Sequence, residues 1–217
     1  IAAGLQKLVK RARISQSEAD ALVARIIPID DINELAGSDL VIEAIVENLA
    51  VKQQLFCQLE TICKSTAILA TNTSSISITA IASVLKRPQQ LVGMHFFNPA
   101  PIMKLVEVIS GLDTSANIAG EIALLVKNWN KEVVMAKSTP GFIVNRVARP
   151  FYAEALRVLQ EGGSDHVTLD YIVRECGGFR MGPFELMDLI GHDVNYAVTQ
   201  SVFNAFYYDQ RFLPSLL

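Results

Sequence analysis

Two residues with complementary acid–base chemistry, His95 and Glu107, stand in neighbouring apolar runs of the sequence. Met94, Phe96 and Phe97 flank the histidine, and the glutamate lies within LVEVI. A carboxylate among Val and Leu needs a partner if it is buried. A carboxylate bound to an imidazole fixes its tautomer and raises its proton affinity, which suits general acid–base catalysis near neutral pH. The pattern alone leaves open a second interpretation, a core histidine with one structural hydrogen bond.

Further polar residues follow the expected strands at the points where these strands end. Ligands bind beyond the carboxyl ends of the strands in an open parallel sheet, so we expect these residues to share one site. The residues are Glu47 and Asn48 after the strand 39–45, the run 72–75 after the strand 67–71, and His95 and Asn98 at the end of the strand 91–97.

Short apolar runs alternate with amphipathic helices in the part of the chain that must position these residues. Strands separated by helices indicate βαβ units and a mostly parallel sheet. Two helices are expected before Arg25, with Ser15 or Ser17 capping the second. The expected strands are Asp39–Ile45, Ala67–Thr71, Leu91–Phe97, Lys104–Ser110 and Lys131–Ala136, with a possible strand over Ile26–Ile29, and the expected helices are Leu49–Lys64, Ser77–Lys86 and Ser115–Asn128.

The pattern changes at the run STPG, residues 138–141. Before it, the two strands 91–97 and 104–110 are joined by a loop too short for a helix, which predicts an antiparallel part in the sheet. After it only helices are expected, over Phe142–Gln160 with a kink at Pro150, Val167–Cys176, Pro183–Ile190 and His192–Tyr207. We therefore expect an α/β Rossmann-like domain over residues 1–139 and an all-helical domain over residues 140–217.

Composition excludes several classes of partner. A net charge of −3 over 217 residues gives no sign of a nucleic-acid partner. No stretch reaches the roughly 18 uninterrupted apolar residues of a membrane span. The spacing of the three cysteines does not predict a metal site, so Cys57, Cys63 and Cys176 are interpreted as small core residues in a reducing cytosol. His166 and His192 are expected to be solvated.

The cofactor cannot be named from the residues alone. A dinucleotide site is expected to show G-x-G-x-x-G after a first strand, with an acidic residue about twenty positions later. Gly177, Gly178 and Gly182 have the wrong spacing and lie among expected helices.

Five segments of the sequence strongly resemble 3-hydroxyacyl-CoA dehydrogenases: DLVIEAIVEN (39–48), ATNTSSISIT (70–79), HFFNPAPIMKLVEV (95–108), STPGFIVNR (138–146) and MGPFELMDLIG (181–191). Together they cover nearly the whole chain in order. NTSSISITAIA, NRVARPFYAEA and VFNAFYYDQRFLPSL look most like the bacterial phenylacetate-pathway branch, which oxidises 3-hydroxyadipyl-CoA or related 3-hydroxyacyl-CoAs. The resemblance implies NAD-dependent oxidation of a 3-hydroxyacyl-CoA to a 3-ketoacyl-CoA, in fatty-acid or phenylacetate degradation.

The resemblance also implies roles for four catalytic residues. His95 would take the 3-hydroxyl proton, and Glu107 would hold and stabilise the resulting imidazolium. Ser74 would lie near both the substrate hydroxyl and the nicotinamide, and Asn145 on the substrate side of the domain junction. Capping of the helix that follows is the other interpretation of Ser74.

For the cofactor, the resemblance implies that Glu47, Lys52, Ser74 and Asn98 face NAD, and no metal is implied. Lys52 could instead be a solvated lysine on an exposed helix turn. In this family Pro usually stands at the position of Arg180, and the role of this arginine stays open.

The resemblance further implies that the glycine-rich first turn, within the family's first βαβ unit, precedes Ile1, and that the rest of the helical domain follows Leu217. A chain without them is expected to bind NAD poorly, because the pyrophosphate would lose its helix N-terminus. The family implies a cytoplasmic homodimer formed through the helical domain. Two alternatives stay open: a non-catalytic homologue of the same fold, and a dehydrogenase of a 3-hydroxy acid without CoA.

Overall fold

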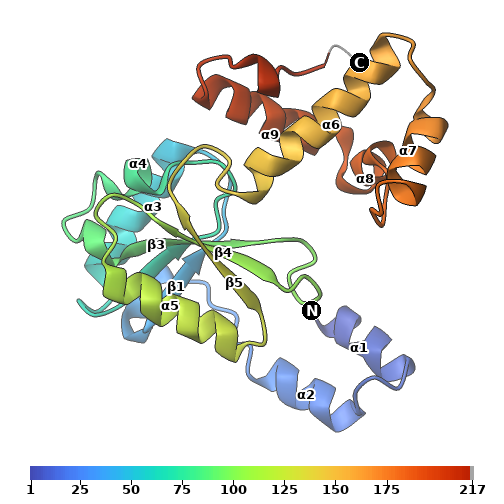
Figure 1. The fold of residues 1–217 in the computed structure, drawn as a ribbon. Coiled ribbons are helices and arrows are strands. Elements are labelled where there is room, and N and C mark those ends of the chain that lie inside the picture. The colour runs from blue at the N-terminus through green and yellow to red at the C-terminus, as the bar shows by residue number, and fades with distance from the viewer. Residues whose placement is uncertain (216–217) are drawn as a thin grey trace. The chain divides into compact units, whose positions relative to one another are not determined.

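A computed structural model describes residues 1–215 of the chain. The chain divides into two compact units, Ile1–Gly37 and a second that begins at Ser38, and each is described separately. Figure 1 shows the elements of both units in chain order.

The first unit contains helices α1 (Ala2–Lys10) and α2 (Gln16–Ala24) and the short 3-10 helix η1 (Ile32–Gly37). Ser15 caps α2: its hydroxyl accepts the amide N–H of Glu18, and the Glu18 carboxylate accepts the amide N–H of Ser15. The predicted cap at Ser15 is confirmed. The possible strand over 26–29 is wrong, since these residues pair with no other strand and Ile27 is 79% exposed.

The second unit is built on one five-stranded sheet of order β1-β2-β3-β4-β5. The strands are β1 (Leu40–Glu43), β2 (Ile68–Thr71), β3 (Leu91–Phe96), β4 (Leu105–Ser110) and β5 (Glu132–Lys137). The first three are parallel, β4 runs antiparallel to β3, and β5 is parallel to β4. The mostly parallel Rossmann-like sheet and its antiparallel part are confirmed.

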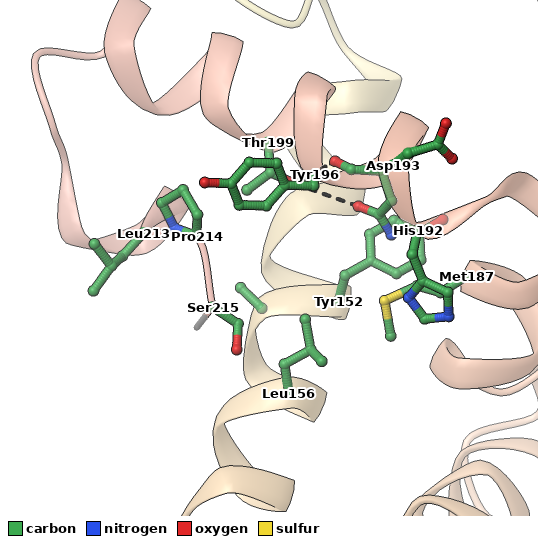
Figure 2. Close-up of a pocket in the computed structure, with 12 residues that line it drawn as sticks. Tyr152, Leu156, Met187, His192, Asp193, Tyr196, Thr199, Leu213, Pro214 and Ser215 are labelled. Atoms are coloured by element: carbon green, nitrogen blue, oxygen red, sulfur yellow. Dashed lines mark hydrogen bonds between the residues drawn. The ribbon is translucent and has the colours of Figure 1, made fainter. Parts of the chain in front are cut away.

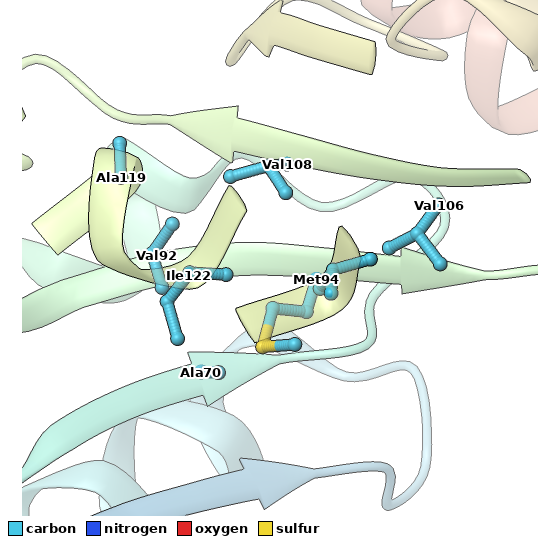
Figure 3. Close-up of a cluster of buried hydrophobic side chains, with 8 residues drawn as sticks. Ala70, Val92, Met94, Val106, Val108, Ala119 and Ile122 are labelled. Carbon is cyan, nitrogen blue, oxygen red and sulfur yellow. The ribbon is translucent and has the colours of Figure 1, made fainter. Parts of the chain in front are cut away.

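One face of the sheet packs against helix α5 (Ala116–Asn128), as the cluster in Figure 3 shows. Side chains alternate between the two faces of a strand. Val92 and Met94 of β3 belong to this cluster, so His95 between Met94 and Phe96 lies on the opposite face. Glu107 lies on that face for the same reason, because Val106 and Val108 face α5. The predicted acid–base residues therefore share the face of the sheet that α5 does not cover.

The other helices near the sheet are α3 (Leu49–Ile62) and α4 (Ile78–Ala82), with the short 3-10 helix η2 (Pro88–Gln90) before β3. Helix α4 is much shorter than the predicted 77–86. The Glu60 carboxylate of α3 accepts the amide N–H groups of Lys86 and Arg87, and the Arg87 guanidinium donates to the Glu60 carbonyl. These tertiary hydrogen bonds replace those of a continuing helix.

The buried stripe of α3 carries Lys52, Phe56 and Leu59, followed at the end of the helix by Cys63. Residue 57 lies about 100° around the helix from Phe56. The prediction of three core cysteines is therefore wrong, because Cys57 and Cys176 are exposed.

After residue 138 the described part of the chain contains helices and no strand, as predicted. These are α6 (Val144–Gln160), α7 (His166–Glu175), α8 (Pro183–Ile190), α9 (His192–Ala205) and the 3-10 helix η3 (Gln210–Phe212). Helix α6 continues through Pro150. Tyr152 of α6 packs with Phe184 and Met187 of α8 in the core of this part. Within residues 1–215 no helix is long and apolar enough to cross a membrane.

Candidate active site

His95 and Glu107 are direct cross-strand partners in the antiparallel register of β3 and β4. The His95 Nδ1 atom lies 2.6 Å from Glu107 Oε2, and both side chains are buried. The rings of Phe97 and Phe142 pack against the imidazole, with centroids 4.5 and 5.7 Å away. The predicted contact of His95 with Glu107 is therefore present in the structure.

The second carboxylate oxygen of Glu107 binds the start of helix α6. Glu107 Oε1 accepts the amide N–H groups of Ile143 and Val144, each at 2.9 Å. Burial alone raises the pKa of Glu107, but the hydrogen bonds from His95 and from these two amides outweigh it, so the pKa lies below its ordinary value. An ionised carboxylate only accepts hydrogen bonds, so His95 donates from Nδ1 and keeps Nε2 as an acceptor.

Ser74 lies in the loop between β2 and α4, and this loop is held by the Glu47 carboxylate. Glu47 Oε1 accepts the Thr73 hydroxyl at 2.5 Å and the amide N–H groups of Ser74 and Ser75 at 3.0 and 3.1 Å. Burial alone raises the pKa of Glu47, but the Thr73 hydroxyl and the nearby Lys52 charge hold it below its ordinary value. Capping by Ser74 is wrong: Ser77 caps α4.

The remaining predicted residues lie around this loop and the end of β3. Asn145, in the first turn of α6, donates from Nδ2 to the Ser74 carbonyl at 3.2 Å. The Asn98 side chain is exposed just beyond β3. Asn72, the first residue of the polar run 72–75 expected at the site, accepts the Phe96 amide N–H on its Oδ1 at 2.8 Å, beside His95. The ends of β2 and β3 are thus joined at the site.

Lys52 is the predicted residue whose environment differs most from expectation. Its side chain is 1% exposed, so the solvated interpretation is wrong. The ammonium lies 2.6 Å from the buried Glu43 carboxylate and 3.4 Å from Glu47 Oε2. Sequence reasoning missed Glu43, although a carboxylate within LVIEAI carries the same signal that singled out Glu107.

A cavity of about 310 Å³ in the helical part contains none of the predicted site residues (Figure 2). Tyr152, Asn195 and Thr199 in its wall all contact the buried Arg149: Tyr152 lies beneath the guanidinium, while Asn195 and Thr199 accept its hydrogen bonds. His192, also in the wall, is exposed and pairs with Asp188. Among residues 1–215 no cluster of three or more His, Cys, Asp or Glu side chains has a geometry that could hold a metal ion.

The arrangement at the sheet edge can carry a proton transfer. The imidazole has one nitrogen fixed by a carboxylate and the other free to accept a proton, the geometry expected of a general base. Loop 72–77 and the first turn of α6 are joined by the hydrogen bond from Asn145 Nδ2 to the Ser74 carbonyl, which brings the polar groups of these two residues close together. These groups suit the orientation of a substrate oxygen.

The two parts of the chain match two profiles of one protein family. Residues 1–139 match the profile described as "3-hydroxyacyl-CoA dehydrogenase, NAD binding domain". Residues 141–217 match "3-hydroxyacyl-CoA dehydrogenase, C-terminal domain".

Similarity to individual proteins supports the same family. The chain is 53% identical over all its 217 residues to a 3-hydroxyadipyl-CoA dehydrogenase of Escherichia coli, of which it spans 46%. It is 40% identical to a 3-hydroxybutyryl-CoA dehydrogenase of Clostridioides difficile, with 93% of this chain and 72% of that protein covered. A crystal structure of 3-hydroxybutyryl-CoA dehydrogenase from Escherichia coli superposes with a TM-score of 0.96 and 53% identity, covering 99% of this chain and 46% of that one. The chain belongs to the 3-hydroxyacyl-CoA dehydrogenase family.

Proposed function

We propose that the protein oxidises the 3-hydroxyl group of a 3-hydroxyacyl-CoA to a ketone, with NAD⁺ as oxidant. The observation that carries this proposal is the His95–Glu107 pair, buried on the face of the sheet that meets the first turn of α6. His95 Nε2 takes the proton of the hydroxyl, and Glu107 stabilises the imidazolium that forms. NAD⁺, when bound, would supply the two-electron acceptor for the hydride from C3.

Residues of this chain orient the imidazole and the substrate oxygen for the proton transfer and limit the water around the imidazole. Glu107 fixes the imidazole tautomer through its hydrogen bond to Nδ1. Ser74 and Asn145 are proposed to orient the substrate oxygen, because their loop and helix turn are joined by a hydrogen bond. The apolar rings of Phe97 and Phe142 beside His95 limit water around the imidazole.

The nicotinamide end of NAD fits the edge where β1, β2 and β3 end. The partly exposed Glu47 carboxylate, the Ser74 hydroxyl and the exposed Asn98 amide offer acceptors and donors there. NAD, when bound, supplies the acceptor of the hydride. The sequence contains no G-x-G-x-x-G, so we assign to residues 1–217 only contacts near the nicotinamide and its ribose.

Replacement of the base tests the proposal in the full-length protein. His95→Ala is expected to lower kcat/KM for acetoacetyl-CoA-dependent NADH oxidation by about 10²- to 10⁴-fold, the usual contribution of a general acid–base group. His192→Ala, which removes an exposed histidine paired with Asp188, is the matched control and should retain activity. Near-normal turnover by folded His95→Ala would refute the proposal. Turnover of free 3-hydroxy acids but not of their thioesters would favour the dehydrogenase without CoA.

We also propose the finer assignments that the relatives suggest: a 3-hydroxyadipyl-CoA or 3-hydroxybutyryl-CoA substrate, a place in phenylacetate or fatty-acid degradation, and a cytoplasmic location. The names of the Escherichia coli and Clostridioides difficile relatives support the substrate class. Comparing kcat/KM for the two thioesters tests it. The family profiles, which meet near residue 140, support a boundary there between an NAD-binding and a helical domain.

A homodimer through the helical part is the proposed assembly. Large apolar side chains are exposed there, including Val147 at 70%, Leu189 at 71% and Tyr171 at 58%. Such exposed apolar surface marks protein–protein contacts when it is contiguous. Sedimentation of the full-length protein should give a dimer, and Leu189→Lys should weaken it. A wild-type monomer would contradict the assembly.

A further inference from the structure

A buried ion pair between Lys52 and Glu43 lies next to Glu47, the carboxylate that holds the loop carrying Ser74. Lys52 Nζ lies 2.6 Å from Glu43 Oε1, and their side chains are 1% and 0% exposed. The rest of the Glu43 carboxylate is also bound: the Ile45 amide N–H donates to Oε1 at 2.6 Å, and the Thr71 hydroxyl donates to Oε2 at 2.7 Å. Burial of two charges is costly unless hydrogen bonds satisfy them, and here they are satisfied.

The same ammonium faces a second carboxylate with a different set of contacts. Glu47 Oε2 lies 3.4 Å from Lys52 Nζ, whereas Glu47 Oε1 holds the Thr73 hydroxyl and the amides of Ser74 and Ser75. One cation thus stands between two carboxylates, with the shorter contact to the fully buried one. Glu47 thus contacts Lys52 through Oε2 and the loop through Oε1.

We propose that Glu43 is a positioning residue for the reaction, acting through Lys52 and Glu47 on the Ser74 loop. The inference rests on the proposed dehydrogenase function for its kinetic consequences, but its structural consequence is independent of that function. Glu43 itself is buried at the end of β1 and acts only through its neighbours.

Glu43→Gln removes the charge and keeps the shape: the amide oxygen can still accept the Ile45 N–H, and the NH₂ group then faces the Thr71 hydroxyl, which accepts instead of donating. Lys52 then has Glu47 as its only anionic partner within this triad, and a closer pair pulls the Glu47 carboxylate away from the amides of the loop. We expect kcat to fall by about 10- to 100-fold, as for a shift of a reacting group by about 1 Å. The KM for NADH should change by less than about threefold, because Lys52 keeps its charge.

The double variant Glu43→Gln/Lys52→Met distinguishes a positioning role of Glu43 from direct contact of Lys52 with the cofactor. Removing both charges leaves Glu47 with its loop hydrogen bonds intact, and neutral replacement of a whole buried pair is tolerated better than loss of one partner. The double variant should therefore recover most of the kcat lost in Glu43→Gln, a non-additivity that a double-mutant cycle measures. If Lys52 contacted the cofactor directly, the double variant would show a higher KM for NADH and no recovery, which would overturn the proposal.

Amide hydrogen exchange gives a readout that does not depend on activity. The Ser74 and Ser75 amides, which Glu47 accepts, should exchange faster in Glu43→Gln and return toward wild type in the double variant. Lys64→Met, which breaks an exposed pair with Asp39 just beyond the same helix, is the control and should change neither rate nor exchange. Unchanged exchange in Glu43→Gln would overturn the proposal, whether or not the wild-type protein turns over the thioester.

A milder variant covers the case in which Glu43→Gln does not fold. Thr71→Val removes one hydrogen bond from Glu43 Oε2 and keeps the charge. It should speed exchange of the same two amides by a smaller factor. Exchange at the wild-type rate in folded Thr71→Val, with no folded Glu43→Gln to compare, would count against the proposal.

Discussion

Glu107→Gln is the variant whose outcome the geometry determines most sharply. The Gln amide must place its oxygen toward the amide N–H groups of Ile143 and Val144, since its NH₂ group cannot accept from them. That orientation turns the NH₂ group toward His95 Nδ1, which must then accept instead of donate. The imidazole proton moves to Nε2, and the nitrogen that should take the substrate proton no longer has a lone pair.

The loss of activity should far exceed the loss of stability. The variant keeps both backbone hydrogen bonds and loses the charge-assisted bond to His95, so the free energy of unfolding should fall by about 1.5–3 kcal/mol. A wrong histidine tautomer lowers kcat by about 10⁴-fold in a comparable carboxylate-to-amide change. We expect about 10³- to 10⁴-fold here, equivalent to about 4–5.5 kcal/mol in the activation barrier.

The assay is acetoacetyl-CoA-dependent NADH oxidation by the full-length protein, with urea unfolding as a parallel measure of stability. Glu121→Gln, the same change at an exposed position of α5, serves as the matched control. ¹⁵N NMR of the imidazole should show the proton on Nδ1 in the wild type and on Nε2 in Glu107→Gln. A folded variant with kcat within tenfold of the wild type, or with the proton still on Nδ1, would refute the reasoning.

Three further predictions concern stability. Gly182→Ala should lower the free energy of unfolding by about 1–3 kcal/mol in urea, because a Cβ there would lie 2.2 Å from Asp170 Oδ1, which is buried and caps helix α8. The pKa of Glu47 is lower in the folded protein than its ordinary value near 4.5. The Glu47 carboxylate therefore contributes its full stabilisation above pH 4.5, and this contribution is lost as the pH falls through the pKa of the folded state. Glu47→Gln should make the free energy of unfolding fall less steeply below pH 4.5. Arg149 is buried without a salt bridge to a carboxylate of the described chain, but it donates to the buried Asn195 Oδ1 and Thr199 Oγ1. Arg149→Met leaves these acceptors without their donor, so the free energy of unfolding should fall by about 1–3 kcal/mol, and an unchanged or higher Tm would contradict this view.

Periodicity predicted most of the fold because apolar spacing decides which face of each element is buried. The five strands and the helical part after residue 138 were predicted within a few residues. One error arose where tertiary hydrogen bonds override local pattern. The helix expected over 77–86 stops at Ala82, and Glu60 of another helix accepts the amide N–H groups of Lys86 and Arg87. No periodicity in the sequence reveals such a bond.

Part of the site was predictable as well, because a charged residue in an apolar strand needs a partner. A carboxylate in an apolar strand indicated that Glu107 needed a partner, and strand pairing supplied His95. The same signal at Glu43 does not identify its partner, because Lys52 lies on a helix and no cross-strand register links the two. Lys52 occupies the buried stripe of α3, where a lysine is unexpected unless an anion is buried with it. The family resemblance identified Ser74 and Asn145, whose contact depends on a long-range arrangement that spacing alone does not give.

Glu107 links the sheet to the helical part as well as to His95. One oxygen holds the imidazole, and the other holds two amides at the positive N-terminal end of α6, the helix that also presents Asn145 to the Ser74 loop. Moving α6 away from β4 would leave a fully buried carboxylate with fewer donors, at a cost of about 1–3 kcal/mol for each unsatisfied group. The proton-transfer pair and the substrate-side asparagine are therefore fixed by one junction, and a change that loosens the start of α6 should disturb both together.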